Sequence, residues 1–457
     1  MSALIALIDE WLPAQRWYAG KGRPVDEVAI ETRIDLGSLD DAAVVDLVVA
    51  VDHGGDIIRY QVPLTLRKEP SDALTFALIG ECDEGFVHDG LADPAGARTW
   101  LAAMLDGHAD VTQRTVAQFH HDSGTLAPDL PSRVVGAEQS NTSVIYGEDA
   151  ILKVFRRLAP GLNPDLEVTQ ALAKVGSPHV PAALGHITGP VADIDTTLAL
   201  MQRFLPHATD GWKLATTSVR DLFAEADLHA DEVGGDFASE AERIGRATAE
   251  VHDALAQVLP TDVDGPEQID ATVQMMHRRL DDALAEVAEL APFGDALHAA
   301  YDAVLAAASK VPVQRIHGDL HLGQLLRVDS GWNLVDFEGE PARPLTDRVR
   351  LMTPLRDVAG MLRSFDYAAR SLLADHQGER SLAFRADEWA DRNRDAFCAG
   401  YAASSGTDPR DSAALLNACE IDKAVYEVLY EVRHRPSWIS IPLAGLARIT
   451  GREEISM

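Results

Sequence analysis

Cysteine is scarce in this chain of 457 residues, which contains only three copies of it. Cys82, Cys398 and Cys419 are too few and too far apart for a disulfide framework or for a zinc site with four cysteine ligands. Isolated thiols of this kind are typical of buried residues in a reducing cytosol. We therefore expect no structural disulfide and no zinc centre built on cysteine.

Positive charge is also in short supply. Forty Lys and Arg residues stand against 72 Asp and Glu residues, which gives a formal net charge of −32, and no basic block interrupts the acidic surplus. A surface that follows nucleic-acid phosphates or binds anionic lipid needs clustered basic side chains. We therefore expect no nucleic acid and no membrane among the partners.

Long apolar runs are missing as well. The apolar N-terminal run has no basic residues before it and is interrupted by Asp9 and Glu10, so it is too short for a signal sequence or a membrane span. With 46% apolar and 25% charged residues, the composition is that of a globular protein. We expect a cytoplasmic protein of two or three domains.

Strand-like and helix-like patterns divide the chain into three parts. The first has short β-like runs at 44–51 and 57–62 with a Gly54-Gly55 turn between them, and the second contains a clear hairpin at 143–155. The third is dominated by helical periodicity, with one β-dense interruption at 311–338. The predicted fold class is α+β, and the three parts are residues 1–90, 91–205 and 206–457.

The β-dense interruption carries the most informative motif, HGDLHLGQ at residues 317–324, which is followed after a turn by DFEGE at residues 336–340. This order matches the phosphoryl-transfer template. In that template a loop Asp accepts the proton of the acceptor hydroxyl, an amide five residues later holds one metal ion, and a second Asp holds another. Carboxylate and amide oxygens suit Mg²⁺. The sequence therefore predicts Asp319 as the base, Gln324, Asp336 and Glu338 as metal ligands, and His317 beside the acceptor.

A nucleotide kinase also needs a cation for the phosphates, and the chain has only seven lysines. Lys153 lies in the middle of a predicted strand, where an unpaired buried ammonium would be costly. Its expected partners are the phosphates and Glu167, an acid in the first turn of the next helix. Backbone N–H groups before the hairpin could cap phosphates, and a later strand end could receive adenine. These two segments contribute Ser140, Asn141, Thr142, Ser143, Gln202 and Phe204.

The C-terminal helix is predicted to begin after a cap at Thr407 or Asp408 and to end before Pro436. At about 100° per residue, one of its faces is apolar and the opposite face is both aromatic and polar. Flat rings beside polar groups suit a carbohydrate. The predicted sugar-binding residues are Lys423, Tyr426, Glu427, Tyr430, Arg433 and Trp438.

Taken together, these motifs resemble the maltokinases of actinobacteria, members of the aminoglycoside-phosphotransferase-like group with the eukaryotic-type kinase fold. The resemblance runs from near residue 15 to near residue 445. It is carried by QRWYAG at 15–20, AEQSNTSVI at 137–145, ILKVFRR at 151–157, SVRDLF at 218–223, EVGGDF at 232–237, HGDLHLGQ at 317–324, DFEGEP at 336–341 and the segment 422–442.

This resemblance implies a bilobal kinase with an N-terminal cap module, a β-sheet N-lobe that binds nucleotide and a mostly helical C-lobe. It also implies ATP- and Mg²⁺-dependent conversion of maltose to maltose 1-phosphate, which feeds α-glucan and glycogen synthesis, with trehalose synthase as a partner. Gln324 stands where protein kinases usually have Asn, and its longer amide keeps the carbonyl ligand but shifts the reach of that ligand relative to Asn.

Two alternatives stay open. The same catalytic loop serves kinases of other acceptors, such as glucosamine or an aminoglycoside. A kinase-like scaffold without activity, binding a glucan or a partner enzyme, is the other, although every chemical position holds a competent residue.

Overall fold

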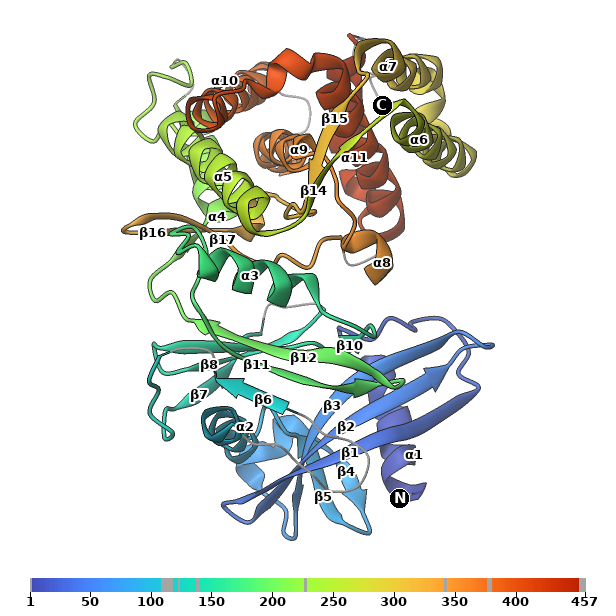
Figure 1. Cartoon of the computed structure of the whole chain (residues 1–457), viewed down its shortest axis with the longest axis vertical. Coiled ribbons are helices and arrows are strands. Elements are labelled where there is room, and N and C mark those ends of the chain that lie inside the picture. Colours follow the sequence, from blue (N-terminus) through green and yellow to red (C-terminus); the bar gives the residue numbers. More distant parts are fainter. Residues whose placement is uncertain are drawn as a thin grey trace. The chain divides into compact units, whose positions relative to one another are not determined.

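The computed structural model of the chain describes residues 2–107, 118–121, 124–136, 140–225, 228–340, 343–375 and 380–451. The protein is α+β, as the sequence predicts, with antiparallel sheets towards the N-terminus and mostly helices after residue 206 (Figure 1). Contacts divide it into two units, Met1–Gln170 with Pro181–Pro206, and Ala171–Val180 with His207–Met457. Within the described residues, no helix is both long and apolar enough to cross a membrane.

The first sheet of the first unit has the strand order β1-β2-β3-β5-β4, all antiparallel. The strands are β1 (Glu27–Leu39), β2 (Ala42–Asp52), β3 (Ile57–Arg67), β4 (Leu78–Cys82) and β5 (Gly85–Asp89). The hairpin between β2 and β3 confirms the predicted turn, and its residues Gly54 and Gly55 have φ values of 74° and 92°. Such values strain residues with a side chain, which explains the glycine pair.

Strand β2 is buried on both faces, which explains its nearly continuous apolar sequence. Val45 and Leu47 face a core covered by helix α1 (Ser2–Trp11). Val44 and Val48 face the other core, which the sheet shares with helix α2 (Pro94–Asp106). The two faces thus place this sheet in the middle of the first unit.

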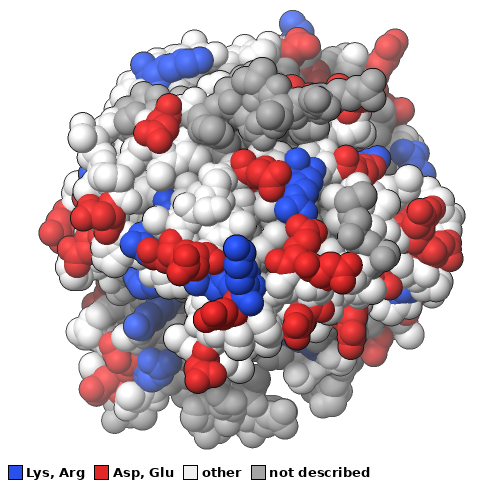
Figure 2. Space-filling model, turned by 90° about the horizontal axis from the view of Figure 1, so that it is seen from below, with Lys and Arg blue, Asp and Glu red and all other residues white. Residues whose placement is uncertain are grey.

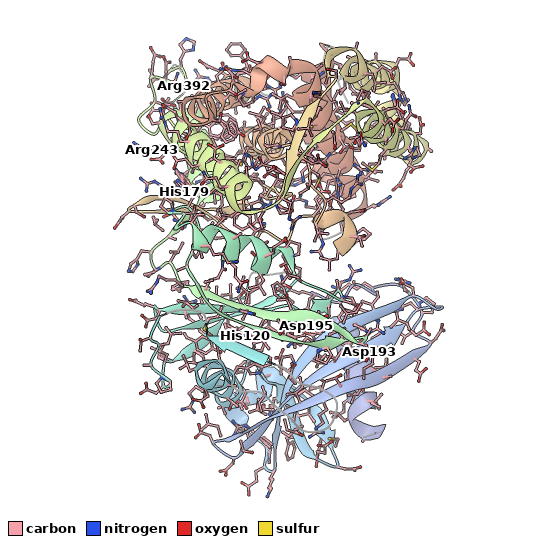
Figure 3. All side chains as sticks on the ribbon, in the orientation of Figure 1. His120, His179, Asp193, Asp195, Arg243 and Arg392 are labelled. Atoms are coloured by element: carbon pink, nitrogen blue, oxygen red, sulfur yellow. The ribbon has the colours of Figure 1, made fainter. Side chains whose placement is uncertain are left out.

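The second sheet has the order β6-β11-β12-β9-β8-β7. Its strands are β6 (Gln118–His121), β7 (Ser132–Val134), β8 (Thr142–Tyr146), β9 (Ala150–Val154), β11 (Ala183–Val191) and β12 (Ile194–Arg203). The predicted hairpin is the β8–β9 pair. In Figure 3, His120 lies on β6, Asp193 lies at the β11–β12 turn and Asp195 lies at the start of β12. The α2 residues Trp100 and Met104 pack against both sheets in one core, so residues 1–90 and the strands that follow are joined through shared apolar packing.

One buried arginine also joins the two sheets. Arg156 precedes the short strand β10 (Arg157–Leu158), which pairs with β3. Its guanidinium is fully buried, donates to Asp89 at 3.0 Å and to Thr142 Oγ1 at 2.8 Å, and lies 4.9 Å from the ring centre of Trp17. Trp17 belongs to the QRWYAG motif, so this motif holds the loop after β9 against the first sheet.

The second unit is mainly helical. Its larger helices are α4 (Gly211–Ala224), α5 (Ala238–Val258), α6 (Pro266–Glu286), α7 (Gly294–Ala307), α9 (Leu355–Ser371), α10 (Arg380–Ser405), α11 (Ala413–His434) and α12 (Ser440–Thr450). Helices α6, α7, α11 and α12 share one apolar core. Helices α5 and α10 approach closely at Gly245 and Gly400, where an added Cβ would meet backbone carbonyl groups. Figure 3 labels Arg243 on α5 and Arg392 on α10.

Short strands frame the motif of the second unit. They are β13 (Thr209–Asp210), β14 (Thr261–Asp264), β15 (Val311–Gln314), β16 (Leu325–Val328) and β17 (Gly331–Leu334), and a short helix α8 (Leu345–Arg348) follows. The predicted strand-turn-strand is thus the β16–β17 hairpin. On the face drawn in Figure 2, acidic and basic side chains are interspersed, in line with the even spread of charge in the sequence.

Candidate active site

The HGDLHLGQ loop runs between β15 and β16, and a buried carboxylate accepts hydrogen bonds from its backbone. Asp357, at the start of α9, is 1% exposed and accepts hydrogen bonds from the backbone N–H groups of His317 at 2.7 Å and Gly318 at 2.8 Å. Its third partner is His252 Nε2 at 3.0 Å. Burial alone would raise the pKa of Asp357, but these donors lower it, so the carboxylate stays charged. Asp357 therefore fixes the backbone of the loop.

The imidazole of His317 links the two halves of the motif. Its Nε2 lies 3.0 Å from the carbonyl oxygen of Val335, which can only accept, so this nitrogen carries the proton. The other nitrogen, Nδ1, then accepts from the backbone N–H of Asp319 at 3.4 Å. The side chain is 2% exposed and packs on Phe337. These contacts commit both ring nitrogens within the loop, which argues for a positioning role and against the predicted contact with the acceptor.

Asp319 forms an ion pair with a lysine that is distant from it in the sequence. Lys423 Nζ, on α11, lies 2.9 Å from Asp319 Oδ1 and 3.1 Å from Glu340 Oε1, and Glu340 also pairs with Arg343. Burial would raise the pKa of Asp319, but Lys423, and His321 after it, lower the pKa to about 2. Asp319 is therefore a carboxylate throughout the physiological pH range.

The predicted metal ligands lie together at the end of β17. Gln324 Nε2 donates to Asp336 Oδ2 at 3.1 Å, and an oxygen of Glu338 lies within 4.8 Å of an oxygen of Asp336. Arg348 lies 3.7 Å from Glu338. Asp336 has a φ of 69°, a left-handed conformation that is uncommon outside glycine and is found where a side chain must point in one direction. This set of hard oxygen donors fits Mg²⁺.

Helix α11 has the two predicted faces. Val425 and Val428 are buried in the core, whereas Tyr426, Tyr430 and His434 form a row, with ring centres 6.4 Å apart in the first pair and 4.5 Å in the second. Asp408 accepts from the N–H of Arg410 and caps a 3₁₀ turn, Pro409–Ser412, that leads into the helix. The α-helix itself begins at Ala413, later than the predicted cap, and it ends at His434, before Pro436, as predicted.

The row continues past the helix. The guanidinium of Arg435 lies between two rings, 5.4 Å from the centre of Tyr430 and 4.5 Å from that of Trp438. Lys423 lies at the other end, 5.2 Å from the ring of Tyr426. An aromatic row therefore leads to the ammonium that contacts Asp319.

Two other predicted sugar ligands have partners elsewhere. Glu427 accepts from Arg363 at 3.0 and 2.8 Å, and Arg433 pairs with Glu286 at 2.6 Å on the surface. Burial raises the pKa of Glu427 above its usual value, while Arg363 opposes that change. Both side chains are engaged in ion pairs within the fold, which argues against the direct contacts with a ligand that the helix geometry predicts.

A pocket of about 820 Å³, counted with its open mouth, lies on another side of α11. Leu415 and Cys419 of this helix line it, together with charged side chains such as Arg279, Arg343, Arg350 and Arg356 and with several apolar side chains. Among them are Ile269, Val273, Met276, Val304, Val311 and Leu351. No Trp, Tyr or Phe is among its described lining residues, so this pocket offers no ring on which a sugar could stack, unlike the aromatic row.

In the first unit, Lys153 lies on β9, a strand that pairs with β8 on one side and with β12 on the other. Its Nζ is 2.9 Å from Asp165 Oδ2, and the two side chains are 13% and 1% exposed. Asp165 is in the first turn of α3 (Pro164–Lys174), as is the predicted partner Glu167. Sequence reasoning missed Asp165 because two acids in one helical turn cannot be ranked by pattern alone. Asn163, which accepts from the Asp165 N–H at 2.8 Å, is the only local signal.

The remaining predicted nucleotide residues occupy the ends of strands. Ser140 is exposed, whereas Asn141 and Ser143 are buried. Thr142 pairs with Val154 in the sheet, and its hydroxyl accepts from Arg156. This leaves Ser140 as the residue of the segment with a solvent-exposed side chain.

At the end of β12, Gln202 Nε2 donates to Thr169 Oγ1 at 3.3 Å. Phe204 donates its backbone N–H to the Asp149 carbonyl at 2.9 Å, and its ring lies 5.8 Å from the guanidinium of Arg133. The backbone of this strand end is thus tied to the β8–β9 hairpin.

Two protein families match this chain, one near its N-terminus and one over most of the rest. Residues 11–93 match the maltokinase N-terminal cap domain, and residues 132–397 match the phosphotransferase enzyme family. A glucosamine kinase from Streptacidiphilus jiangxiensis is 31% identical over 328 residues, which are 69% of this chain and 73% of that protein. A glucosamine kinase from Mycolicibacterium smegmatis is 30% identical over 69% of this chain and 78% of that protein.

A solved structure of glucosamine kinase in complex with glucosamine, ADP and inorganic phosphate has a TM-score of 0.69 and 27% identity, and the match covers 97% of this chain and 98% of that one. These matches confirm the resemblance that the sequence motifs carry. The chain belongs to the phosphotransferase enzyme family and has a maltokinase N-terminal cap domain in front of its phosphotransferase domain.

Proposed function

We propose that this phosphotransferase moves the γ-phosphoryl group of ATP to the anomeric hydroxyl of maltose and releases maltose 1-phosphate. The observation that carries the proposal is the charged Asp319, paired with Lys423 at the end of an aromatic row, in a chain with a maltokinase-type cap. In this assignment residues 1–90 are the cap, 91–205 the nucleotide-binding lobe and 206–457 the lobe with the catalytic loop.

Asp319 is the residue that receives the acceptor hydroxyl. Its carboxylate stays deprotonated because the positive charge of Lys423 lowers its pKa. It can therefore accept the hydroxyl proton as the oxygen attacks the phosphorus. The bond from the acceptor oxygen to phosphorus forms while the bond to the leaving ADP oxygen breaks. His317 and Asp357 do not react and instead hold the loop that carries Asp319.

Gln324, Asp336 and Glu338 would hold Mg²⁺. The metal supplies charge neutralisation for the phosphate oxygens when it is bound. Asp336 would be the main carboxylate ligand by family resemblance, and its backbone has an unusual left-handed conformation. Gln324 would contribute its carbonyl oxygen while its amide nitrogen donates to Asp336.

The acceptor is placed along Tyr426, Tyr430 and Trp438, whose ring faces can stack on the apolar faces of glucosyl units. Lys423 then lies near the sugar hydroxyl that reacts. By family resemblance the product feeds α-glucan synthesis, and trehalose synthase is a partner.

Glucosamine is the second candidate acceptor, because the two relatives and the solved structure described above are glucosamine kinases. An ammonium group on the acceptor needs an uncommitted carboxylate. Here Glu340 is paired with Lys423 and Arg343, and Glu427 is paired with Arg363. The nearest acids are thus already neutralised by protein cations, which favours a neutral sugar.

Acceptor identity is tested by ADP release with maltose, glucose, glucosamine and kanamycin, followed by NMR of the product. We expect the highest kcat/KM with maltose and a phosphoester on its anomeric carbon. Turnover with glucosamine or kanamycin alone would overturn the maltose assignment and leave the phosphotransferase mechanism in place.

The ion pair of Lys153 makes a separate prediction for the nucleotide site. We expect Asp165→Asn to raise the KM for ATP by about tenfold, because Lys153 loses a buried charged partner 2.9 Å away. Glu167→Gln, in the same helical turn, is the matched control and should change this KM less. Steady-state kinetics with varied ATP at saturating acceptor measure both, and the reverse order would return the partner role to Glu167.

A further inference from the structure

Two partly buried histidines face each other between α6 and α7. The rings of His277 and His298 are nearly parallel, with planes 16° apart and centres 4.9 Å apart. Their Nδ1 atoms are 2.7 Å apart. Each Nε2 meets a carboxylate of the opposite helix, with Asp302 3.0 Å from His277 and Asp281 3.2 Å from His298. None of the four residues belongs to the active site described above.

The proton positions in this cluster follow from its donors and acceptors. A charged carboxylate only accepts, so both Nε2 atoms carry a proton. A neutral imidazole carries one proton, so each Nδ1 then presents a lone pair to the other. Two lone pairs at 2.7 Å repel, and a cation between them removes the repulsion. That cation is either a shared proton or a metal ion.

The carboxylates favour a metal ion. Histidines that bind metals usually donate the other ring N–H to a carboxylate, which fixes the tautomer and makes the ligand nitrogen more basic. Both His277 and His298 have this arrangement. His277 is also held edge-on by Tyr301, at 5.5 Å and 86°. The two nitrogen ligands are therefore oriented before any ion arrives.

We propose that His277 and His298 bind a divalent transition-metal ion of the zinc class through their Nδ1 atoms, joining α6 to α7. Imidazole nitrogen suits Zn²⁺, Co²⁺, Ni²⁺ and Cu²⁺ and suits Mg²⁺ poorly, so this ion differs in kind from the one assigned to Asp336.

The rings must separate a little to admit the ion. Metal–nitrogen bonds of about 2.0–2.1 Å in a tetrahedral site put the two nitrogens about 3.3 Å apart, which requires an opening of about 0.6 Å. The side chains are 17% and 31% exposed, so water can reach the ion and complete its coordination.

The experiment is calorimetric titration of the full chain with ZnCl₂ in a buffer without nucleotide, repeated with CoCl₂ and visible absorption. We expect His277→Ala and His298→Ala each to remove one binding event. His229→Ala, which alters an exposed histidine paired with Glu388, is the matched control and should keep that event. Asp302→Asn should weaken it by about 10–100-fold while both ligands remain.

Circular dichroism shows whether each variant is folded. If His277→Ala is unfolded, His277→Gln replaces it, because glutamine keeps a polar side chain of similar reach. Zinc binding that is equal in the wild type and in both folded ligand variants, or no zinc binding in the wild type, would overturn the proposal. The cation between the rings would then be a proton. Neither result depends on the acceptor that the enzyme phosphorylates.

Discussion

Replacing Asp319 with asparagine is expected to lower kcat by about 10³-fold, within the range that a positioned general base contributes. The amide keeps the size of the side chain but cannot take the hydroxyl proton. Lys423 retains Glu340 at 3.1 Å, so the buried ammonium still has a charged partner and the fold should persist. Steady-state ADP release with varied acceptor measures the loss.

Nucleotide affinity provides the control for this variant. Binding of a fluorescent ATP analogue should change less than about threefold, because the proposed phosphate contacts come from other residues. The midpoint of thermal unfolding reports whether the variant is intact. An Asp319→Asn enzyme that is folded and retains near-normal kcat would remove Asp319 from the mechanism.

Replacing Lys423 with methionine is expected to move the acid limb of the pH–kcat profile upwards by about 1–3 pH units. Asp319 has a pKa of about 2 in the folded protein, below its value in an unfolded chain. The ion pair therefore stabilises the fold above that unfolded value, and the contribution is lost as the pH falls through about 2. Without Lys423, burial raises the pKa of Asp319, so the carboxylate becomes protonated at a higher pH.

Lys423→Arg is the matched variant because it keeps the positive charge. Its profile should keep the acid limb of the wild type, even if kcat falls because the guanidinium has a different shape. Profiles between pH 3 and 8 for the three proteins make the comparison, because this window covers the limb expected for the methionine variant. If the methionine variant shows no upward shift relative to the arginine variant, the charge of Lys423 does not set the ionisation of Asp319.

Local sequence patterns determined much of the fold and part of the candidate site. Asp319, Gln324 and Asp336 lie within 18 positions of one another, and the β16–β17 hairpin is a local element that brings Gln324 beside Asp336. The faces of α11 and its end before Pro436 followed from helical periodicity and the stop residue, because these signals act within one turn of the helix, whereas Asp408 caps the 3₁₀ turn before it.

Only the tertiary structure decided which partners the charged side chains have. Lys423 is 104 positions from Asp319, and Arg363 is 64 positions from Glu427. Arg433 pairs with Glu286, and Lys153 pairs with Asp165, an acid that the sequence pattern did not single out. A long charged side chain can reach several neighbours, and its choice depends on which helices pack beside it. Periodicity within one segment carries no information about that packing. Local patterns are sufficient to predict a turn, a pair of adjacent strands or the faces of a helix, because these depend on neighbouring residues alone.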